Sequence, residues 1–439
     1  MCRVRKLEQA IVQHFIRSAL LVGWIANGVT ALADWPQFRG PDGQGHVPQG
    51  QLPLRWSEQQ NLRWKVQIPG KGWSSPVCGE GQIWLTSATE EGQSLRALAV
   101  ELASGKVLHD VELFRHNEPG PIHATNSYAS PTPVLDNGRV YVHFGTAGTA
   151  CLSTDGTVLW KQQSLAFRHP HAPGSSLVIH EERVFVTCDG TDVQFVVALD
   201  KYTGKVIWKQ PRNHLEAARE KDKLEPPGRR GFPLMAYSTP LVVDAVGRTQ
   251  LISTAADHVA SYDVQDGEEI WWYPYDGFSV VARPILGNDC VFIVGFEDQS
   301  LPVMYAIRPT AVGQITNEQI VWTQRKNVSH VPSPLLIGDA IYVIGDEGVA
   351  ACLDAATGAI VWKHRIGGNF SASPISVGDR IYLLSEEGQM TVLAADTRFH
   401  MLATNQLEGH FMASPAVAEN ALILRSASHL YNIEENADQ

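Results

Sequence analysis

The sequence ALDKYTGKVIW, at residues 198–208, decides the fold of this chain. It recurs as CLDAATGAIVW at residues 352–362 and, in weaker form, as SYDVQDGEEIW at residues 261–271. Each copy joins the end of an apolar strand, a turn around Gly and a second strand that reaches Trp. Such repeats, spaced by roughly 40 to 60 residues with about four strands each, are typical of a β-propeller.

A short signal precedes each repeat and allows the repeats to be counted. In most repeats a Ser or Thr followed by Pro comes before an apolar run that is bounded by Gly, Asp or Asn turns. Pro at the start of a strand removes no ladder hydrogen bond, so this position suits it. The repeats start near Pro76, Pro131, Leu177 (where Pro is replaced), Pro240, Pro284, Pro334, Pro374 and Pro415. We therefore predict an all-β fold, an eight-bladed β-propeller of four-stranded antiparallel blades.

The last repeat indicates how the ring closes. It offers only three strands, which end near residues 430–433. The missing strand has a counterpart near the other end of the chain, where NLRWKV at residues 61–66 matches the outer-strand pattern VIWK at residues 206–209. We predict that an N-terminal strand at about 61–68 completes the C-terminal blade, because closure pairs the two sheet edges that an open array would expose.

The repeat pattern A-x-D-x-x-x-G-x-x-x-W resembles that of the PQQ-like repeat superfamily, over residues 61–433. WPQFRG at residues 35–40 and GWSSP at residues 72–76 look like stretches of exported propellers described as PQQ-binding-like. The superfamily contains eight-bladed quinoprotein alcohol dehydrogenases and a noncatalytic propeller lipoprotein of the outer-membrane assembly machinery. The resemblance implies the fold, and it makes pyrroloquinoline quinone (PQQ) with calcium a cofactor to test.

The sequence departs from the dehydrogenase branch of that superfamily in two respects. Those enzymes typically place a disulfide between adjacent cysteines over the quinone, and this sequence has no Cys-Cys pair. They also hold Ca²⁺ with carboxylates beside a catalytic Asp, and no such set maps onto these positions. The sequence therefore assigns no catalytic residue, no metal ligand and no cofactor, and PQQ with calcium remains an alternative.

Charge and the N-terminal segment indicate where the protein works. The formal net charge is −11 at pH 7, which argues against a nucleic-acid partner because phosphates attract a basic face. Residues 1–33 have the pattern of a signal peptide, with basic Arg3, Arg5 and Lys6, an apolar run and the cleavage motif Ala31-Leu32-Ala33. No other stretch approaches the about 20 apolar residues of a membrane span. We expect an exported protein, periplasmic, secreted or in the cell envelope, with no transmembrane segment after cleavage.

Two segments interrupt the repeats. Residues 34–60 are rich in turn formers, and we expect them to form a strap along the outside of the propeller. Residues 209–236 form an insertion between blades, in which Asn213 to Leu224 has the pattern of a helix. Such an insertion can be a lid or a docking surface, or a solvated loop without function. The repeats would end at residue 433, followed by a tail at residues 434–439.

Cysteine and tryptophan both favour a structural interpretation. The five cysteines that follow residue 33 lack C-x-x-C spacing, so we interpret them as small buried residues, with a disulfide or a metal site as the alternative. Six outer strands carry a Trp that we expect to pack over the Gly turn of the next blade, tying the ring together. These are Trp64, Trp160, Trp208, Trp271, Trp322 and Trp362, with His109 and Leu402 in the equivalent places of two further blades.

A ligand site is expected where the loops that lead into the innermost strands converge on the propeller axis. Nearly every repeat places an aromatic residue or an imidazole there. The candidate ligand-binding residues are Trp73, Tyr128, His171, Tyr237, Arg283, His330, Asn369, Phe370, His410 and Phe411. Such a ring could stack a planar ligand, with Arg283 pairing a carboxylate or phosphate. The alternative is that these residues only pack around a water-filled channel.

Two functions follow from this sequence. The first is a binding or assembly module, with an unknown small molecule, glycan or protein as partner, that uses the axial mouth or the 209–236 insertion. The second is an oxidoreductase that uses PQQ and Ca²⁺ on an alcohol or a sugar. The repeats are complete and no pair of residues has the spacing of a nucleophile and base, so the first function is our main prediction.

Overall fold

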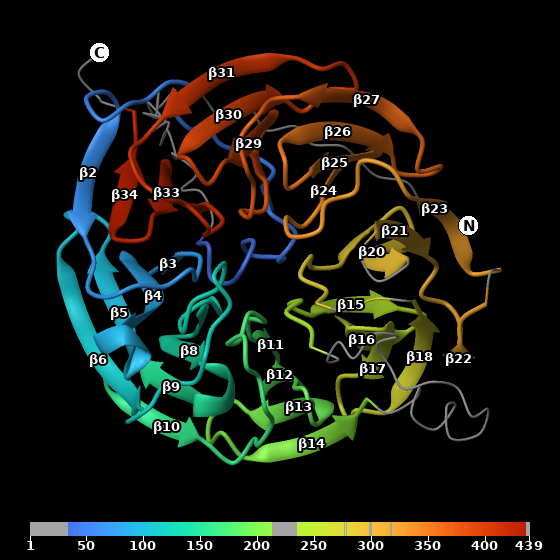
Figure 1. Ribbon diagram of the computed structural model, residues 1–439, viewed down its shortest axis with the longest axis horizontal. Helices are drawn as coiled ribbons and strands as arrows, with labels where there is room; N and C mark the ends of the chain where they lie inside the picture. Colours follow the sequence, from blue (N-terminus) through green and yellow to red (C-terminus); the bar gives the residue numbers. More distant parts are fainter. Residues whose placement is uncertain are drawn as a thin grey trace, which may run out of the picture. The chain divides into compact units, whose positions relative to one another are not determined.

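The computed structural model describes residues 34–212, 235–275, 277, 279–297, 301–316 and 318–435. In this part of the chain the regular elements are β-strands and two short 3-10 turns, η1 (Glu90–Gly92) and η2 (Gly145–Ala147). Figure 1 shows the strands as successive sheets around a common axis, in chain order from blue to red. The predicted eight-bladed propeller of four-stranded antiparallel blades is confirmed. Among the described residues, no helix is long and apolar enough to cross a membrane.

The first four blades have these strands, from the axis outward. Blade 1 contains β3 (Val77–Gly79), β4 (Gln82–Thr89), β5 (Ser94–Glu101) and β6 (Val107–Arg115). Blade 2 contains β7 (Val134–Asp136), β8 (Arg139–His143), β9 (Thr149–Ser153) and β10 (Val158–Gln162). Blade 3 contains β11 (Val178–His180), β12 (Arg183–Asp189), β13 (Gln194–Asp200) and β14 (Val206–Pro211). Blade 4 contains β15 (Leu241–Ala245), β16 (Arg248–Thr254), β17 (His258–Asp263) and β18 (Glu269–Pro274), and β22 (Gly313–Gln314) pairs with β18.

The last four blades repeat this order. Blade 5 contains β19 (Ile285–Gly287), β20 (Cys290–Glu297), β21 (Leu301–Ile307) and β23 (Ile320–Gln324). Blade 6 contains β24 (Leu335–Ile337), β25 (Ala340–Ile344), β26 (Val349–Asp354) and β27 (Ile360–Arg365). Blade 7 contains β28 (Ile375–Val377), β29 (Arg380–Leu384), β30 (Gln389–Ala394) and β31 (Met401–Gln406), and β1 (His46–Val47) pairs with β28. Blade 8 contains β32 (Ala416–Ala418), β33 (Ala421–Arg425), β34 (His429–Ile433) and β2 (Leu62–Gln67).

The eighth blade closes the ring as predicted. Strand β2 pairs antiparallel with β34, with Leu62 opposite Ile433 and Gln67 opposite His429. Figure 1 shows the two strands side by side, one blue and one red. The outer strand of the last blade therefore comes from the N-terminal part of the ring, and both sheet edges that would otherwise remain open are paired.

The hydrophobic core lies between neighbouring blades. One buried cluster joins Trp84 of blade 1 to Val140 of blade 2, and another joins Tyr342 of blade 6 to Ile381 of blade 7. Each sheet is therefore covered on both faces, which explains why its middle strands are apolar at successive residues. Burial at about 25 cal/mol per Å² of apolar surface makes these contacts the main stabilising force of the ring.

The outer-strand tryptophans tie successive blades together, as predicted for four of them. The rings of Trp64, Trp160, Trp208 and Trp322 lie against the turn glycines Gly105, Gly204, Gly267 and Gly358 of the following blades. Each indole also donates to a backbone carbonyl of that turn, at 2.9 to 3.2 Å. A Cβ on any of these glycines would lie within 3.0 Å of the indole. Trp271 differs, because its indole donates to Gln250 of its own blade.

The five cysteines of the described residues are buried and free, which agrees with their interpretation as small core residues. The start of blade 2 needs a correction. The sequence offers both Pro131 and Pro133, and the prediction at Pro131 is wrong by two residues because β7 begins at Val134. The predicted signal peptide (1–33), the predicted helix at 213–224 and residues 436–439 of the tail lie outside the described residues.

The first part of the N-terminal strap, residues 35–47, crosses the axis instead of following the outside of the ring, whereas its later part reaches the outer strand β31 of blade 7, where the backbone N–H of Trp56 donates to Asn405. Trp35 pairs with Cys78 of blade 1, and the carbonyl of Pro36 accepts from Leu135 of blade 2. On the opposite side Gln44 accepts from Leu286 of blade 5, and β1 then pairs with β28 of blade 7. Because these partners lie on the innermost strands of distant blades, residues 35–47 fill one end of the axial channel. We call this segment the plug.

Candidate functional site

The other end of the channel holds a cavity of about 750 Å³. The starts of all eight blades contribute to its wall, and Phe38 of the plug contributes to its lining. Its volume lies in the range of about 300–1,000 Å³ that is typical of small-molecule sites. The plug therefore turns an open channel into a pocket, which we call the axial cavity.

A ring of hydroxyl groups fixes the wall of this cavity. The residue before each blade start is Ser or Thr in seven blades, and its hydroxyl accepts a hydrogen bond from the backbone N–H of the equivalent residue in the preceding blade. The seven bonds measure 2.9 to 3.1 Å. They involve Ser75, Thr132, Ser176, Thr239, Ser333, Ser373 and Ser414, all buried. Each bond satisfies a backbone N–H that is buried at the blade junction. These hydroxyls are therefore structural.

Arg283 occupies the eighth position of this ring and interrupts it. Its backbone N–H donates to Ser333, but its side chain turns to the plug, where Nη1 donates to the carbonyl of Phe38 at 2.7 Å. The guanidinium packs directly on Gly43, since a Cβ there would lie 2.3 Å from Nη1. Burial lowers the pKa of Arg283 to about 10. Arg283 thus anchors the plug instead of lining the cavity.

A second buried guanidinium holds the plug from within. Arg39 is 1% exposed, and its Nη2 donates to the carbonyls of Gln44 and Pro334, both at 2.7 Å. Burial, followed by repulsion from Arg283, lowers the pKa of Arg39 to about 9. The bonds to Pro334 and Phe38 connect blades 5 and 6 to the plug, so this end of the channel is closed by specific polar contacts.

One side of the axial cavity is formed by imidazoles and a phenol. His171 Nδ1 lies 3.2 Å from the hydroxyl of Tyr237, and the rings of His123 and His171 are 5.4 Å apart. His169 packs edge-on against Tyr237 at 5.1 Å, and behind it lies the buried His143. Burial and then repulsion from a neighbouring imidazole lower the pKa of His169 to about 4 and that of His143 to about 3. These rings are neutral at pH 7. We call this wall the imidazole side.

The opposite wall carries carboxylates, which we call the carboxylate side. Asp346 and Glu347 come from the turn between β25 and β26, and Glu386 comes from the equivalent turn between β29 and β30. Asp346 Oδ1 accepts from the backbone N–H of His330 at 3.0 Å and of Val331 at 3.2 Å. Glu386 Oε1 accepts from the Ser371 hydroxyl at 2.5 Å. These bonds fix the carboxylates at the edge of the cavity before any ligand arrives.

Six of the ten sequence-predicted site residues line the axial cavity: Trp73, His171, Tyr237, His330, Asn369 and Phe370. The indole Nε1 of Trp73 is buried and has no acceptor among the described residues. Asn369 donates to Glu387 at 2.7 Å. Whether a ligand uses these residues stays a prediction.

The other four predicted residues lie elsewhere. Arg283 anchors the plug, as described above. Phe411 is fully buried and packs against Tyr431 of blade 8, and His410 packs edge-on against Trp73 at 5.6 Å. Tyr128 lines a separate pocket of about 260 Å³, where its hydroxyl donates to the Gly120 carbonyl at 2.7 Å. These positions differ because a single residue along a strand start decides whether a side chain faces the axis or the blade core.

Sequence reasoning missed the carboxylate side and the part played by Phe38. A signal for the carboxylates was present, because blades 6 and 7 carry Gly345-Asp346-Glu347-Gly348 and Ser385-Glu386-Glu387-Gly388 at the same place in consecutive repeats. Phe38 gave no such signal, since its place depends on where the plug crosses the axis.

The residues of the axial cavity do not fit PQQ with calcium. Within the described ranges, no group of three or more His, Cys, Asp and Glu side chains could hold a metal ion. PQQ carries several carboxylate groups, whereas the described lining contains carboxylates and no Lys or Arg. A polyanion would therefore meet like charges on one wall and no described cation on the other. Trp73 and Tyr237 would offer stacking surfaces only.

A family model described as outer membrane protein assembly factor BamB matches residues 62–364, 310–401 and 346–437. No curated protein matches this sequence. Among solved structures, BamB from Moraxella catarrhalis has a TM-score of 0.55 and 12% sequence identity, covering 84% of this chain and 99% of its own.

Two dehydrogenases have the same fold. The quinohemoprotein alcohol dehydrogenase from Comamonas testosteroni gives a TM-score of 0.65 at 10% identity, covering 92% of this chain and 81% of its own. A europium-containing methanol dehydrogenase gives 0.63 at 11% identity, covering 91% of each chain. At these identities the likeness concerns the fold, which serves an assembly factor and enzymes alike.

Proposed function

The chain belongs to the propeller family described as outer membrane protein assembly factor BamB, and we propose that it is a binding or assembly module whose site is the axial cavity. Its occupant would be a small molecule, a glycan or a segment of a protein. The 209–236 insertion is the second surface that the sequence predicts for such a module, and residues 213–234 of it lie outside the described residues.

The observation that carries this proposal is how the cavity is built. Its hydroxyls are committed to backbone hydrogen bonds between blades, and Arg283 is committed to the plug. What remains for a ligand is a set of recognition groups: the indole of Trp73, the phenol of Tyr237, imidazoles and carboxylates. Aromatic surfaces with a few fixed polar groups are typical of a site that orients and holds its ligand.

We also propose that the protein works outside the cytoplasm, in the cell envelope. The family description refers to an outer membrane assembly factor, and the sequence of residues 1–33 has the pattern of a signal peptide. Both observations point to export. N-terminal sequencing of the protein recovered from the envelope would test this, and we expect the mature chain to start at Asp34. A mature chain that retains residue 1 would contradict cleavage.

The alternative function is an oxidoreductase that uses PQQ and Ca²⁺. It is favoured by two structures of similar fold, both of which are dehydrogenases. It is opposed by the anionic character of the described cavity lining. The two functions therefore make opposite predictions about one ligand.

Reconstitution separates the two functions. Purified protein is mixed with PQQ and Ca²⁺, and both the absorbance of bound quinone and dye-linked oxidation of alcohols and sugars are measured. We expect neither a stoichiometric complex nor turnover. A stoichiometric complex that is lost in the Trp73→Ala variant would favour the oxidoreductase over the binding or assembly module.

A second test examines protein that is purified together with whatever ligand it has bound in the cell. Native mass spectrometry of protein purified from the envelope should show an additional bound mass in the wild type. Trp73→Ala should lose that mass, since the indole lines the cavity, whereas the exposed-surface variant Glu182→Gln should keep it. Retention of the mass in Trp73→Ala would place the ligand elsewhere and contradict the proposed site.

A further inference from the structure

The charges of the axial cavity are unevenly distributed. Asp346, Glu347 and Glu386 contribute carboxylates from blades 6 and 7, and the described lining contains no Lys or Arg. The imidazole side lies across the cavity, and burial lowers the pKa of His171, which lines the cavity, and that of its neighbour His169. The carboxylates of the described lining therefore face no Lys or Arg across the cavity.

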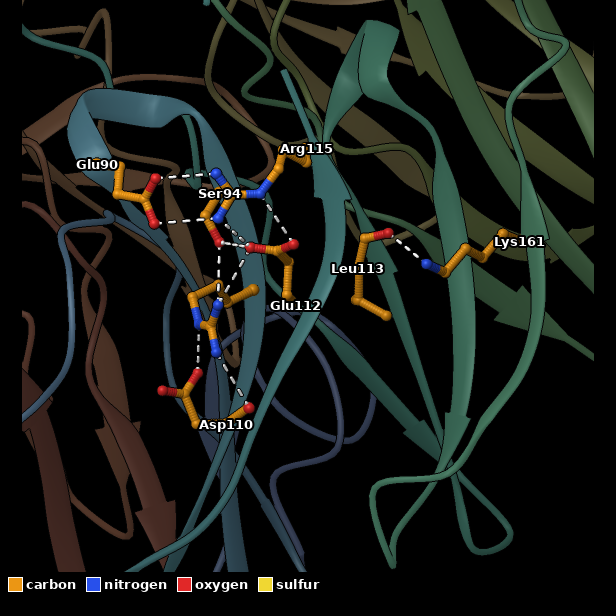
Figure 2. Close-up of polar contacts among 8 residues, drawn as sticks. Glu90, Ser94, Asp110, Glu112, Leu113, Arg115 and Lys161 are labelled. Carbon is orange, nitrogen blue, oxygen red and sulfur yellow. Dashed lines mark hydrogen bonds and ion pairs between the residues drawn. The ribbon is translucent and has the colours of Figure 1, made fainter. Parts of the chain in front are cut away.

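Elsewhere in the described part of the chain, several carboxylates are paired with arginines. Figure 2 shows an example on blade 1, where Arg115 lies between Glu90 at 2.9 Å and Glu112 at 2.8 Å. In the same network Arg96 pairs with Asp110 at 2.5 Å. Both arginines come from the strands that carry or face these carboxylates. On blade 1, therefore, this fold places arginines beside strand carboxylates, whereas the described lining of the axial cavity has no Lys or Arg beside its carboxylates.

Three arginines, from blade 6, blade 5 and the plug, donate to backbone carbonyls. Arg365 Nη1 donates to the backbone carbonyl of Glu347 at 3.0 Å. Arg283 and Arg39 donate to carbonyls of the plug and of blade 6, and Phe38 of the plug lines the cavity. His330 Nδ1 lies 3.7 Å from Asp346 Oδ2 and is the imidazole on this wall. A ligand cation would therefore add the missing partner.

The carboxylates are also preorganised. Asp346 receives two backbone N–H groups, and Glu386 receives the Ser371 hydroxyl. Both occupy equivalent turns of adjacent blades, so their spacing follows from the propeller repeat. Phe370 lines the cavity between these turns, and its backbone N–H donates to the Asp346 carbonyl at 2.8 Å. A cation held here would have an aromatic ring beside it, which adds a cation–π contact.

We propose that the axial cavity selects organic cations: an ammonium or guanidinium group faces Asp346, Glu347 and Glu386, and its apolar body packs against Phe370, Trp73 and Tyr237. This inference rests on the proposed function and specifies the ligand class of the same site. Charge-assisted hydrogen bonds to fixed carboxylates supply the selectivity, and the three aromatic rings of the lining supply the apolar contact. A free amine and a basic peptide share this chemistry.

Acid should weaken this binding. Burial lowers the pKa of His171, so this imidazole gains positive charge, and adds it to the cavity lining, only in acid. His123 beside His171 and His330 beside Asp346 are the other imidazoles that face this site from the described residues. Salt should weaken the binding as well, since the cavity opens to solvent.

Isothermal titration calorimetry with matched peptides tests the proposal. The probes are the end-blocked tripeptides Lys-Trp-Lys and Glu-Trp-Glu, with tryptamine as a free amine. We expect Lys-Trp-Lys to bind and Glu-Trp-Glu not to bind. Asp346→Asn combined with Glu386→Gln should weaken Lys-Trp-Lys binding by at least about tenfold, because the charge-assisted hydrogen bonds to the ammonium group are lost. The control Glu182→Gln should change nothing.

The outcomes distinguish a free amine from a basic peptide as the ligand. They also distinguish failure of the charge selection from failure of the proposed binding function. If tryptamine binds as well as the peptide, the natural ligand is a free amine, and if only the peptide binds, it is a basic segment of a polypeptide. Binding of Glu-Trp-Glu as tight as that of Lys-Trp-Lys, or no loss in the double variant, would overturn the charge selection. If neither peptide binds while envelope-purified protein keeps its Trp73-dependent mass, the proposed function stands and this inference fails.

Discussion

The two ends of the axial channel are formed by the same eight blades, but one end is closed by the plug and the other holds the axial cavity. At one end the guanidinium of Arg39 in the plug donates to the Pro334 carbonyl of blade 6, and Arg283 of blade 5 donates to the Phe38 carbonyl of the plug. At the other end the same blades leave a cavity whose polar groups face each other across open space. The difference shows that the repeat builds a channel, whereas residues outside the repeat decide which end remains available to a ligand.

The hydroxyl ring lies between these two ends and serves both. Each hydroxyl satisfies a backbone N–H of the preceding blade, so the positions of all blade starts depend on their neighbours. Arg283 is the exception, and it is the residue that grips the plug. The place where the ring is interrupted is therefore the place where the closed end is anchored.

The largest effect should come from emptying the closed end. Trp35 is fully buried against blade 1, and its ring packs on Gly40 of the plug. Trp35→Ala should lower the free energy of unfolding by about 3–5 kcal/mol, because it removes a large core ring and leaves a cavity. Urea unfolding followed by circular dichroism measures this. A loss below about 1 kcal/mol would show that the plug is not part of the cooperative core.

The buried imidazoles His169 and His143 should make the free energy of unfolding depend on pH. The pKa of His169 is lowered to about 4 and that of His143 to about 3, from about 6.5 in the unfolded chain. Between pH 6.5 and pH 4 the unfolded chain binds protons that the folded chain does not, so stability is full above pH 6.5 and falls with pH. The slope should reach at most about 1.4 kcal/mol per pH unit for each imidazole.

Urea unfolding at a series of pH values from 7.5 to 4.5 tests this dependence. The His143→Gln, His169→Gln double variant should have a flatter profile than the wild type across this range. Equal slopes in the two proteins would contradict the neutral state that the structure gives these imidazoles.

Removing one hydrogen bond of the hydroxyl ring should cause a smaller loss of unfolding free energy. Thr132→Val removes the acceptor of the Ser75 backbone N–H while keeping the shape of the side chain. Leaving a buried N–H unsatisfied should cost about 1–2 kcal/mol of unfolding free energy. The exposed Thr397→Val is the matched control and should change stability by less than about 0.5 kcal/mol. Equal effects of the two substitutions would mean that the ring is not stabilising.

The smallest effect on stability should come from the carboxylate side. Asp346→Asn keeps an oxygen that can accept from the N–H groups of His330 and Val331, and it removes only the charge. We expect a change of less than about 0.5 kcal/mol in thermal or urea unfolding. A loss of several kcal/mol would show that Asp346 supports the fold, and the role in ligand binding would then need another explanation.

Much of the fold could be predicted from the sequence because a propeller repeats its own signals. The Pro-containing entries before the innermost strands predicted the number of blades, and the strand missing from the last blade, matched by the segment around Trp64, predicted the closure. The start of blade 2 was misplaced because Pro131 and Pro133 carry the same signal two residues apart. The local sequence pattern does not show which of the two prolines precedes the strand, whereas the pairing of β7 with β8 shows that it is Pro133.

The site was predictable only in part, for a different physical reason. Trp73, Tyr237 and Phe370 were identified because aromatic residues recur just before the blade starts. Arg283 shares that position, but its direction is set by the Phe38 carbonyl, which comes from a segment 245 residues away in sequence. No periodic pattern encodes such a contact. The same limit explains why the strap was expected outside the ring.

The most direct measurement of the central claim compares the two ends in the envelope itself. A photoreactive amino acid is placed at Tyr237, in the axial cavity, or at Gln37, in the plug, and the products are compared after irradiation. We predict a defined adduct from position 237 that competes with added Lys-Trp-Lys, and little or none from position 37. Equal adducts from both positions, or an adduct from position 37 alone, would contradict the assignment of the open end as the binding site.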